Sequence, residues 1–525
     1  MRAAYHSLVS TSISEQSPAP VSDRLDARVL VVAGVVVLGA IMSILDITVV
    51  SVALQTFQRE FDATSAQVAW TMTGYTLALA TVIPMTGWAA DRFGTKRLYL
   101  LAVLLFTAGS VLCSTAETLE ALVAFRVLQG LGGGMLMPLG MTILTRAAGP
   151  ERVGRVMAVL GIPMLLGPIF GPILGGWLID IASWHWIFLI NLPIGLAALV
   201  YAAVVLPKDS VEPSESFDWV GMLLLSPGLA AFLYGVSTTP ETGTLWDAEV
   251  LVPALLGLAL IAAFVPWALR RHNLHPLVQL RLFENRDMTV AVIAMSLFAI
   301  AFFGASLLFP LYFQQVRGED ALSAGLLLAP QGIGAMITMP IAGVLADRIG
   351  PGKIVVTGIV LITAAMAVFT TVTDTTSYPL MIGALFVMGL GMGGTMMPIM
   401  ASALATLTDH NIARGSTLMN IVQQVAASMG TALFSVLLTN NVKNTDYPAL
   451  VGLQMRLPSL SGQELEAARA QVAALASRAM PQLGGAYADV FVVATALVAL
   501  VLVPAFLLPR RRPEKPADPA ALMGH

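Results

Sequence analysis

The chain has 525 residues, of which 57% are hydrophobic and only 11% are charged, and its formal net charge is −3. A soluble domain carries about a quarter charged residues, so this composition excludes a soluble enzyme or a nucleic-acid-binding protein. Apolar runs of about 20 residues recur along the chain, and each is long enough to cross about 30 Å of hydrocarbon. The sequence therefore predicts an all-α polytopic membrane protein.

Fourteen apolar windows are predicted to span the membrane. They cover 28–53, 66–90, 98–115, 119–145, 153–179, 184–206, 219–238, 249–268, 288–314, 321–346, 354–373, 378–407, 414–438 and 487–508. An even number of spans places both termini on the same side. With both termini in the cytoplasm, most Lys and Arg residues fall in inner tails and loops, as the positive-inside rule requires. The Arg-rich, Ala-rich composition indicates a bacterial source, so we expect a bacterial cytoplasmic membrane protein.

An internal repeat divides the chain into two halves. GWAADRFGTKR begins at Gly87 and GVLADRIGPGK at Gly343, while GLGGGMLMP (130–138) is echoed by GLGMGGTMMP (389–398). Six spans per repeat leave spans seven and eight as a central insertion, and duplicated six-span halves are typical of secondary transporters. The predicted parts are a cytoplasmic N-terminal tail (1–27), an N-terminal six-helix bundle (28–207), two inserted helices (208–275), a C-terminal six-helix bundle (276–508) with a long outer loop (439–486), and a cytoplasmic C-terminal tail (509–525).

The long outer loop contains its own helical pattern. SGQELEAARAQVAALASRAM opens with Ser461 followed three residues later by Glu464, which is the spacing of a capping box. We expect a surface helix here that serves as a lid or spacer.

One acid and one basic residue lie deep within the predicted spans. Asp46 interrupts SILDITVVSVAL in span one, and Arg126 lies in span four. At 1.5 Å per residue, each lies roughly 10 Å below the outer boundary, so the two can pair. A charge at this depth costs about 2.5–3.5 kcal/mol on insertion scales and marks a functional site by default. A static ion pair is one interpretation; a proton-binding carboxylate beside a fixed positive charge fits better.

Two further motifs are candidates for conformational gating. In span five, Gly167, Gly171 and Gly175 recur every four residues, a spacing that lets helices approach closely. Pro168 and Pro172 adjoin them and add kinks, so the segment is either a tight packing face or a seam that bends between conformations. In the loop after span two, Asp91, Arg92 and Gly94 form either a topology anchor or a latch that opens when the halves rock.

Uncharged polar residues in or near the spans are candidates to line a substrate pathway, or to hydrogen-bond between helices. They are Gln129, Gln331, Asn420, Gln423 and Gln424. The sequence has no Walker loop, no metal-ligand cluster and no nucleophile–base constellation, so we expect a transporter rather than an enzyme. It would need no cofactor and would be driven by a proton gradient.

Several motifs together carry a resemblance to a known family. They are L-D-x-T-x-V-x-V-A-L (45–54), G-x-x-x-D-R-x-G-x-K-R (87–97), R-x-x-Q-G-x-G (126–132), G-P-x-x-G-P-x-x-G-G (167–176) and WHWIFLINLPIG (184–195). The chain resembles the fourteen-span drug:proton antiporter branch, of EmrB/QacA type, of the major facilitator superfamily. Two features depart from the pattern: His185 stands where an arginine is usual, and span twelve has no arginine matching Arg126.

The resemblance implies a major facilitator fold of two six-helix bundles plus two inserted central helices. It assigns proton coupling to Asp46 and Arg126, and conformational gating to Asp91, Arg92, Gly94, Gly167, Pro168, Gly171, Pro172 and Gly175. It implies efflux of drugs, lipophilic or cationic, in exchange for protons. The alternative is proton-driven export of a dedicated endogenous metabolite, lipid or antibiotic. The expected partners are small molecules, protons and the lipid bilayer, with no nucleic acid.

Overall fold

The structure is a computed structural model that describes residues 26–149, 152–209, 216–239, 244, 246–270, 273, 275–319 and 321–510. Within these residues all regular secondary structure is helical. The predicted tails 1–27 and 509–525 fall almost wholly outside the described residues.

The first half of the chain forms one bundle. Its helices are α1 (Ala27–Glu60), α2 (Ser65–Phe93), α3 (Thr95–Cys113), α4 (Leu119–Ala148), α5 (Val153–Ile181), α6 (Trp186–Leu189) and α7 (Asn191–Val205). Helices α8 (Trp219–Ser237) and α10 (Ala248–Ala268) follow as a pair.

The second half forms a second bundle. Its helices are η2 (Leu280–Glu284), α11 (Arg286–Ser306), α12 (Leu308–Gln315), α13 (Ala321–Ile349), α14 (Pro351–Phe369), α15 (Tyr378–Gly393), α16 (Met396–Ala405), α17 (Asp409–Lys443), α18 (Tyr447–Arg456), η3 (Leu457–Ser459), α19 (Gly462–Leu500) and α20 (Leu502–Ala505).

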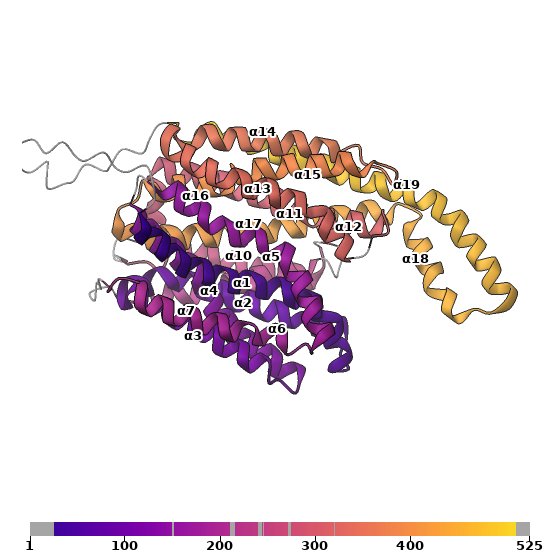
Figure 1. The fold of residues 1–525 in the computed structure, drawn as a ribbon, viewed down its shortest axis with the longest axis horizontal. Helices are drawn as coiled ribbons and strands as arrows, with labels where there is room; N and C mark the ends of the chain where they lie inside the picture. Colours follow the sequence, from indigo (N-terminus) through magenta and orange to yellow (C-terminus); the bar gives the residue numbers. More distant parts are fainter. Residues whose placement is uncertain are drawn as a thin grey trace, which may run out of the picture.

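Thirteen helical stretches of the described residues are long and apolar enough to cross a membrane. Helix α5, an apolar helix of 29 residues, lies between the fourth and fifth of them. Together they are consistent with the fourteen predicted spans. The long helices run side by side, and the described chain begins and ends at the same end of the bundle, here called the terminal end (Figure 1). The opposite end is called the hairpin end, because α18 and the start of α19 project from it.

The predicted surface helix is not a separate element. Residues 462–500 form one continuous helix, α19, so the last span extends well beyond the bundle. The expected capping box is also wrong, because the side chain of Ser461 makes no capping hydrogen bond. A real capping box starts α2, where Gln67 N donates to Thr64 Oγ1 at 3.3 Å and Thr64 N donates to Gln67 Oε1 at 2.9 Å. The spacing of a capping box in the sequence therefore does not ensure that the capping box forms.

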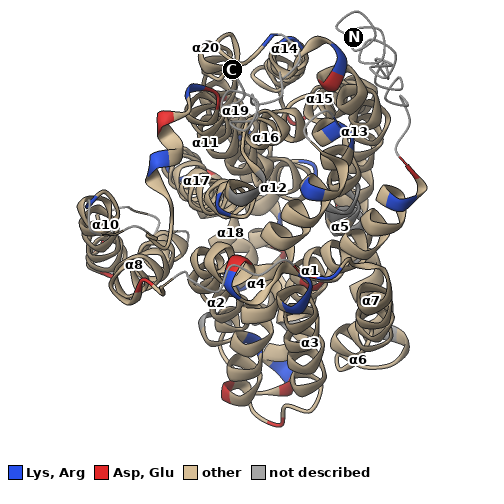
Figure 2. Cartoon of the chain, turned by 90° about the vertical axis from the view of Figure 1, so that its left-hand side faces the viewer, with Lys and Arg blue, Asp and Glu red and all other residues tan. Residues whose placement is uncertain are grey.

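The α8–α10 pair stands at the side of the two bundles (Figure 2). Ser226 of α8 ties it to α2 by donating to the Thr81 carbonyl at 2.8 Å. The carboxylate of Asp218 organises its base, accepting hydrogen bonds from Trp267 Nε1 at 2.8 Å and from Leu277 N at 3.0 Å. The acid before α8 thereby fixes both α10 and the segment that leads into the second bundle.

Helices α1 and α5 pack with almost no space between them. A methyl group on Gly167 would clash with the side chain of Ile44, and one on Gly171 would clash with Thr48. Close approach of this kind requires glycine, because any side chain would separate the two backbones. The glycine face of α5 is therefore the seat of α1.

We predict that Gly171→Ala lowers the free energy of unfolding by about 1–3 kcal/mol, because overpacking a tight contact forces neighbouring atoms apart. Gly176→Ala is the matched control, since nothing lies within 4 Å of the added carbon. Thermal unfolding in one detergent should separate the two variants. Equal melting temperatures would show that the α1–α5 contact is not limiting for stability.

Candidate functional site

The deep acid and the deep arginine are in direct contact. Arg126 Nη1 donates to Asp46 Oδ2 at 2.5 Å, and the two side chains are 1% and 0% exposed. Removal of either charge from water is costly, and the cost is offset only by close pairing and further hydrogen bonds. Both groups therefore have to be bound on every side, and the surrounding helices provide for that.

A glutamine one turn along α4 completes the binding of both charges. Gln129 Nε2 donates to Asp46 Oδ1 at 2.7 Å, and Gln129 Oε1 accepts from Arg126 Nη1 at 2.7 Å. The two oxygens of Asp46 thus accept one hydrogen bond each, which is the arrangement of an ionised carboxylate. Gln129 was predicted as a candidate to line a substrate pathway. It is fully buried in this charge network instead.

The network continues into α3 and α7 through neutral polar groups. Gln129 Nε2 also donates to Ser110 Oγ at 3.0 Å, and Asn191 Nδ2 donates to the same oxygen at 3.0 Å. Ser110 Oγ in turn donates to the Phe188 carbonyl at 3.1 Å. The charge pair is consequently connected to four helices of the first bundle, α1, α3, α4 and α7, and to α6 through Phe188.

The remaining faces of Arg126 are bound by α2. Its Nε donates to the Thr71 carbonyl at 3.0 Å, and its guanidinium carbon lies 4.2 Å from the centre of the Tyr75 ring. An aromatic face stabilises a desolvated cation by about 2 kcal/mol or more. The Tyr75 hydroxyl lies 3.2 Å from Ser43 Oγ, one turn before Asp46 on α1. Arg126 therefore keeps several partners if the charge of Asp46 is neutralised.

Glycines after Arg126 determine how closely α2 and α3 approach α4. A methyl group on Gly130 would meet the Tyr75 carbonyl oxygen, and one on Gly132 would meet the backbone of α3 at Phe106. The R-x-x-Q-G-x-G motif thus combines the charged group, its amide partner and the two close helix contacts that bring the other partners within reach.

A second polar cluster lies at the terminal end, where the loop motif of the first half meets the second bundle. Arg414 of α17 approaches Asp91 with Nε 3.4 Å from Oδ2, and Arg146 of α4 lies 3.5 Å from the other carboxylate oxygen. The Asp91 side chain is 4% exposed. The Asp91 carboxylate therefore joins α2 to α4 of its own bundle and to α17 of the second bundle. Arg92 makes no ion pair within the described residues.

The same contact recurs with the halves exchanged. Asp347 lies in the second copy of the loop motif, on α13, and its Oδ2 is 3.4 Å from Arg155 Nε on α5. Its Oδ1 accepts from Gly154 N at 2.9 Å. A methyl group on Gly343 would meet the Gly154 carbonyl oxygen, so α5 and α13 also touch through their backbones. Two equivalent ion pairs thus join the bundles at the terminal end.

The sequence prediction missed Arg155, Arg414 and Asp347. A signal for them was present in the internal repeat. Arg155 follows the start of the segment 130–138 at the same distance as Arg414 follows the start of the repeat 389–398. Asp347 occupies the position of Asp91 in the repeated loop motif. Extending the repeat by one further helix would have predicted both pairs.

Gly94 has a separate role from the ion pairs. Its φ of 95° allows α2 to end and α3 to begin at one residue, a conformation that a side chain disfavours. Asp209, after α7, fills the space where a side chain would stand, and accepts from Lys96 N at 2.7 Å and from Arg97 N at 3.2 Å. The loop motif is therefore clamped to α7 on one side and to α17 on the other.

The other predicted pathway residues are not gathered in one place. Asn420 joins the bundles, with its amide nitrogen 2.8 Å from the Ser416 carbonyl and 3.1 Å from Met141 Sδ of α4. Gln424 borders a small space between α2, α8 and α17, and Gln423 is partly buried on the same helix. Gln331 lies on α13, where it packs against Gly389 of α15. No cluster of His, Cys, Asp or Glu suited to a metal occurs in the described part of the chain.

Comparison with known proteins identifies relatives over most of this chain. A profile described as Major Facilitator Superfamily matches residues 36–431. The "Multidrug resistance protein B homolog" of Mycobacterium tuberculosis is 52% identical over 497 residues, which cover 93% of this chain and 92% of that protein. The "Multidrug export protein EmrB" of Escherichia coli is 30% identical over 408 residues, covering 77% of this chain and 79% of that protein.

Solved structures share the fold at low sequence identity. The human organic anion transporter MFSD10 superposes with a TM-score of 0.57 at 15% identity, over 90% of this chain and 100% of that one. The proton:xylose symporter XylE superposes with a TM-score of 0.54 at 14% identity, over 90% of this chain and 96% of that one. The predicted fold class is confirmed, and the chain is a transporter rather than an enzyme.

We predict strong energetic coupling between Asp46 and Arg126. In a double-mutant cycle of Asp46→Asn and Arg126→Gln, the coupling free energy should exceed about 1.5 kcal/mol, because the pair is desolvated. The control cycle uses Glu466→Gln and Arg469→Gln, an ion pair whose side chains are 74% and 62% exposed. An exposed pair couples by about 0.2–1 kcal/mol. Chemical unfolding in detergent measures both, and equal coupling would contradict the prediction.

Proposed function

The chain belongs to the major facilitator superfamily, and from this premise we propose that it is a proton-coupled multidrug efflux antiporter. It exports lipophilic or cationic compounds across a bacterial cytoplasmic membrane by alternating access, with both termini in the cytoplasm. The single observation that carries the proposal is the fully buried Asp46–Arg126 pair. Relatives named multidrug resistance and multidrug export proteins support the class of cargo.

In this mechanism Asp46 binds and releases the coupling proton. As an ionised group it accepts from Arg126 and Gln129. A proton on Oδ2 removes the acceptor that Arg126 uses and leaves the guanidinium with Thr71, Gln129 and the ring of Tyr75. Those neutral partners hold the cation during the protonated part of the cycle. The two protonation states therefore differ in the force between α1 and α4.

Helix α5 is the proposed route from the proton site to the gate. Its central glycines seat α1 on either side of Asp46, and its first turn carries Gly154 and Arg155, which bind Asp347 of the other bundle. A shift of α1 after protonation therefore acts on α5, and the far end of α5 acts on one of the two ion pairs. The coupling is carried by packed elements that are contiguous in the structure.

The two ion pairs at the terminal end act as paired latches in this proposal. With Asp91–Arg414 and Asp347–Arg155 formed, the bundles are held together on the side assigned to the cytoplasm. Rocking of one bundle against the other breaks both pairs and opens the cytoplasmic side for the cargo. The side chains of both pairs are buried, so the strength of each pair biases the equilibrium between the two states.

Export of one dedicated endogenous metabolite, lipid or antibiotic is the alternative. The same proton site and latches serve either cargo, so a compound panel decides between them. Transport of several unrelated lipophilic cations by one preparation supports multidrug export. Transport of a single chemical class supports the alternative.

We predict that Asp46→Asn abolishes drug-induced proton movement. In energised everted vesicles, drug addition to wild type should release lumenal protons, which a pH-sensitive dye reports. Asn preserves the size of the side chain but cannot ionise, so the release should fall to background while the amount of folded protein is unchanged. Glu120→Gln is the control, because it removes an exposed acid from α4. Full proton release by Asp46→Asn would exclude the coupling role.

We predict that Asp347→Asn shifts the equilibrium toward the state that is open at the terminal end. The readout is Asn420→Cys in a Cys113→Ser background, because Cys113 is the chain's cysteine and Asn420 lies between the bundles. An impermeant maleimide applied from the cytoplasmic side should label it several-fold faster in the Asp347→Asn variant. Glu466→Gln, at an exposed site, is the charge-matched control. Unchanged labelling would contradict the latch.

A further inference from the structure

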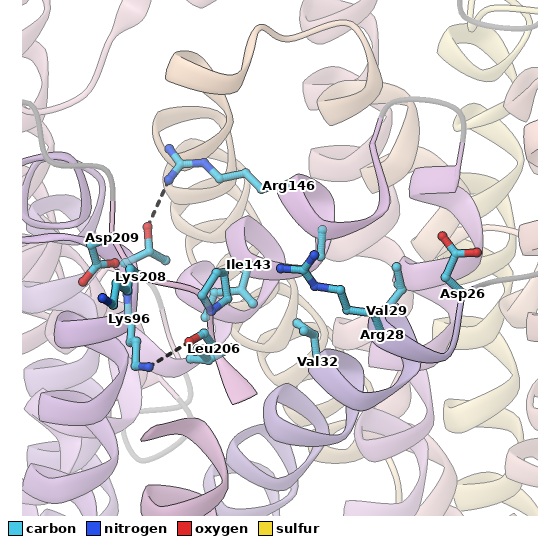
Figure 3. Close-up of a pocket in the computed structure, with 13 residues that line it drawn as sticks. Asp26, Arg28, Val29, Val32, Lys96, Ile143, Arg146, Leu206, Lys208 and Asp209 are labelled. Atoms are coloured by element: carbon cyan, nitrogen blue, oxygen red, sulfur yellow. Dashed lines mark hydrogen bonds between the residues drawn. The ribbon is translucent and has the colours of Figure 1, made fainter. Parts of the chain in front are cut away.

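A pocket of about 450 Å³ lies at the terminal end of the first bundle, apart from the proton site. It is enclosed by the first turns of α1 and α3, the last turn of α4 and the segment after α7 (Figure 3). Its charged lining consists of Arg28, Lys96, Arg146, Lys208, Asp26 and Asp209. Four basic residues thus face two acids. Because all the walls belong to one bundle, rocking of the two bundles leaves the pocket intact.

Both acids of the lining are already engaged. Asp26 pairs with Arg152 at 3.2 Å, and in Figure 3 its carboxylate lies at the edge of the pocket, away from the other charges. Asp209 accepts from the backbone N–H groups of Lys96 and Arg97, as described above. Within the described residues, neither carboxylate forms an ion pair with Arg28 or Lys208.

The four cations form two groups that differ in whether they have partners among the described residues. Lys96 Nζ donates to the Ala203 and Leu206 carbonyls at 2.7 Å each, and Arg146 is bound to Thr95 and Asp91. Arg28 and Lys208 are exposed, and neither has a hydrogen-bond or ion-pair partner among the described residues. Figure 3 shows the guanidinium of Arg28 directed into the pocket, toward Ile143. Within the described residues, the charges of Arg28 and Lys208 thus border this space without a paired counter-ion.

The pocket also borders the surface that faces lipid. Leu30 of α1 and Val204 of α7 are 51% and 79% exposed, and α1 and α7 are tied together where Tyr201 donates to the Val31 carbonyl. Helices begin and end at this level, so it is the depth of the phospholipid headgroups. Val29 and Leu206 form an apolar floor beneath the charges. A molecule with a phosphate head and acyl chains would meet both surfaces at once.

We propose that this pocket binds the phosphate of an anionic phospholipid headgroup. Arg28 and Lys208 contact the phosphate oxygens, and the acyl chains lie along the exposed faces of α1 and α7. Basic pockets between membrane helices on the cytoplasmic side are suited to anionic headgroups, and each cation near the surface contributes to the attraction. A free phosphate compound shares the headgroup chemistry but gains nothing from the apolar faces.

The test measures lipid retention on the purified full-length protein by native mass spectrometry. The probes are dioleoyl phosphatidylglycerol, dioleoyl phosphatidylcholine and soluble glycerol 3-phosphate. The variants are Arg28→Gln with Lys208→Gln, the charge-conserving Arg28→Lys with Lys208→Arg, and the control Arg59→Gln with Lys443→Gln. The control removes two exposed cations from the hairpin end. Size-exclusion profiles and melting temperatures verify that every variant is folded.

Wild type, the charge-conserving variant and the control should each retain phosphatidylglycerol in preference to phosphatidylcholine. The Arg28→Gln, Lys208→Gln variant should bind phosphatidylglycerol at least about tenfold more weakly, because two surface cations are lost. Equal retention of the two lipids by wild type, or unchanged retention by that variant, would overturn the proposal. Tight glycerol 3-phosphate binding that depends on Arg28 and Lys208, without a preference for phosphatidylglycerol, would assign the pocket to a soluble phosphate and reject the lipid.

Discussion

The interaction on which the rest of the structure depends is the Asp46–Arg126 ion pair. A carboxylate and a guanidinium that are both out of contact with water are tolerated only with dense compensation. Here the compensation comes from Gln129, Thr71 and the ring of Tyr75. Three helices, α1, α2 and α4, must therefore stand at fixed distances around the pair, and the glycines of α4 and α5 make those distances possible. Packing and chemistry are specified by the same short motifs.

The two bundles are alike at the ion pairs that join them and unlike at the buried Asp46–Arg126 pair. The repeat places one carboxylate in each loop motif, and each meets an arginine of the opposite bundle, Arg414 or Arg155. The second half has no counterpart of Arg126, because Leu385 stands at the equivalent position. In the proposed mechanism, the symmetric contacts let a rigid rocking motion break both ion pairs together, and the one proton site proposed at Asp46 is sufficient to bias that motion.

Much of the fold could be predicted from the sequence. Long apolar runs indicate which segments lie in the hydrocarbon, and the positions of basic residues indicate which loops face the cytoplasm. The equal depth of Asp46 and Arg126 was likewise predicted, since depth depends only on the rise of a helix. Their contact was not, because it depends on helix rotation and on which helices are neighbours. For Gln129 the sequence left two roles open, pathway lining or hydrogen bonding between helices, because it does not show in which direction a polar side chain points; the structure places it in interhelical hydrogen bonds.

Short sequence patterns were less reliable predictors than the long apolar runs. Ser461 and Glu464 have the spacing of a capping box, yet the Ser461 side chain makes no capping hydrogen bond, whereas the same spacing forms a capping box at the start of α2. The glycines of span five make the close contact with α1 that their spacing allows, whereas their role in gating stays a prediction. Arg155 and Arg414 lie near loop boundaries, where basic residues are common, so only their matching places in the two repeats distinguish them from a topology signal.

The most direct test of the proposed coupling is proton release by the purified protein when it binds cargo. A lipophilic cation such as tetraphenylphosphonium is added to the protein in weakly buffered detergent solution, and an indicator dye reports the pH. Competition between cargo and proton at Asp46 predicts release of about one proton per cation bound by wild type and none by Asp46→Asn. Equal proton release by both proteins would place the coupling group elsewhere and contradict the account.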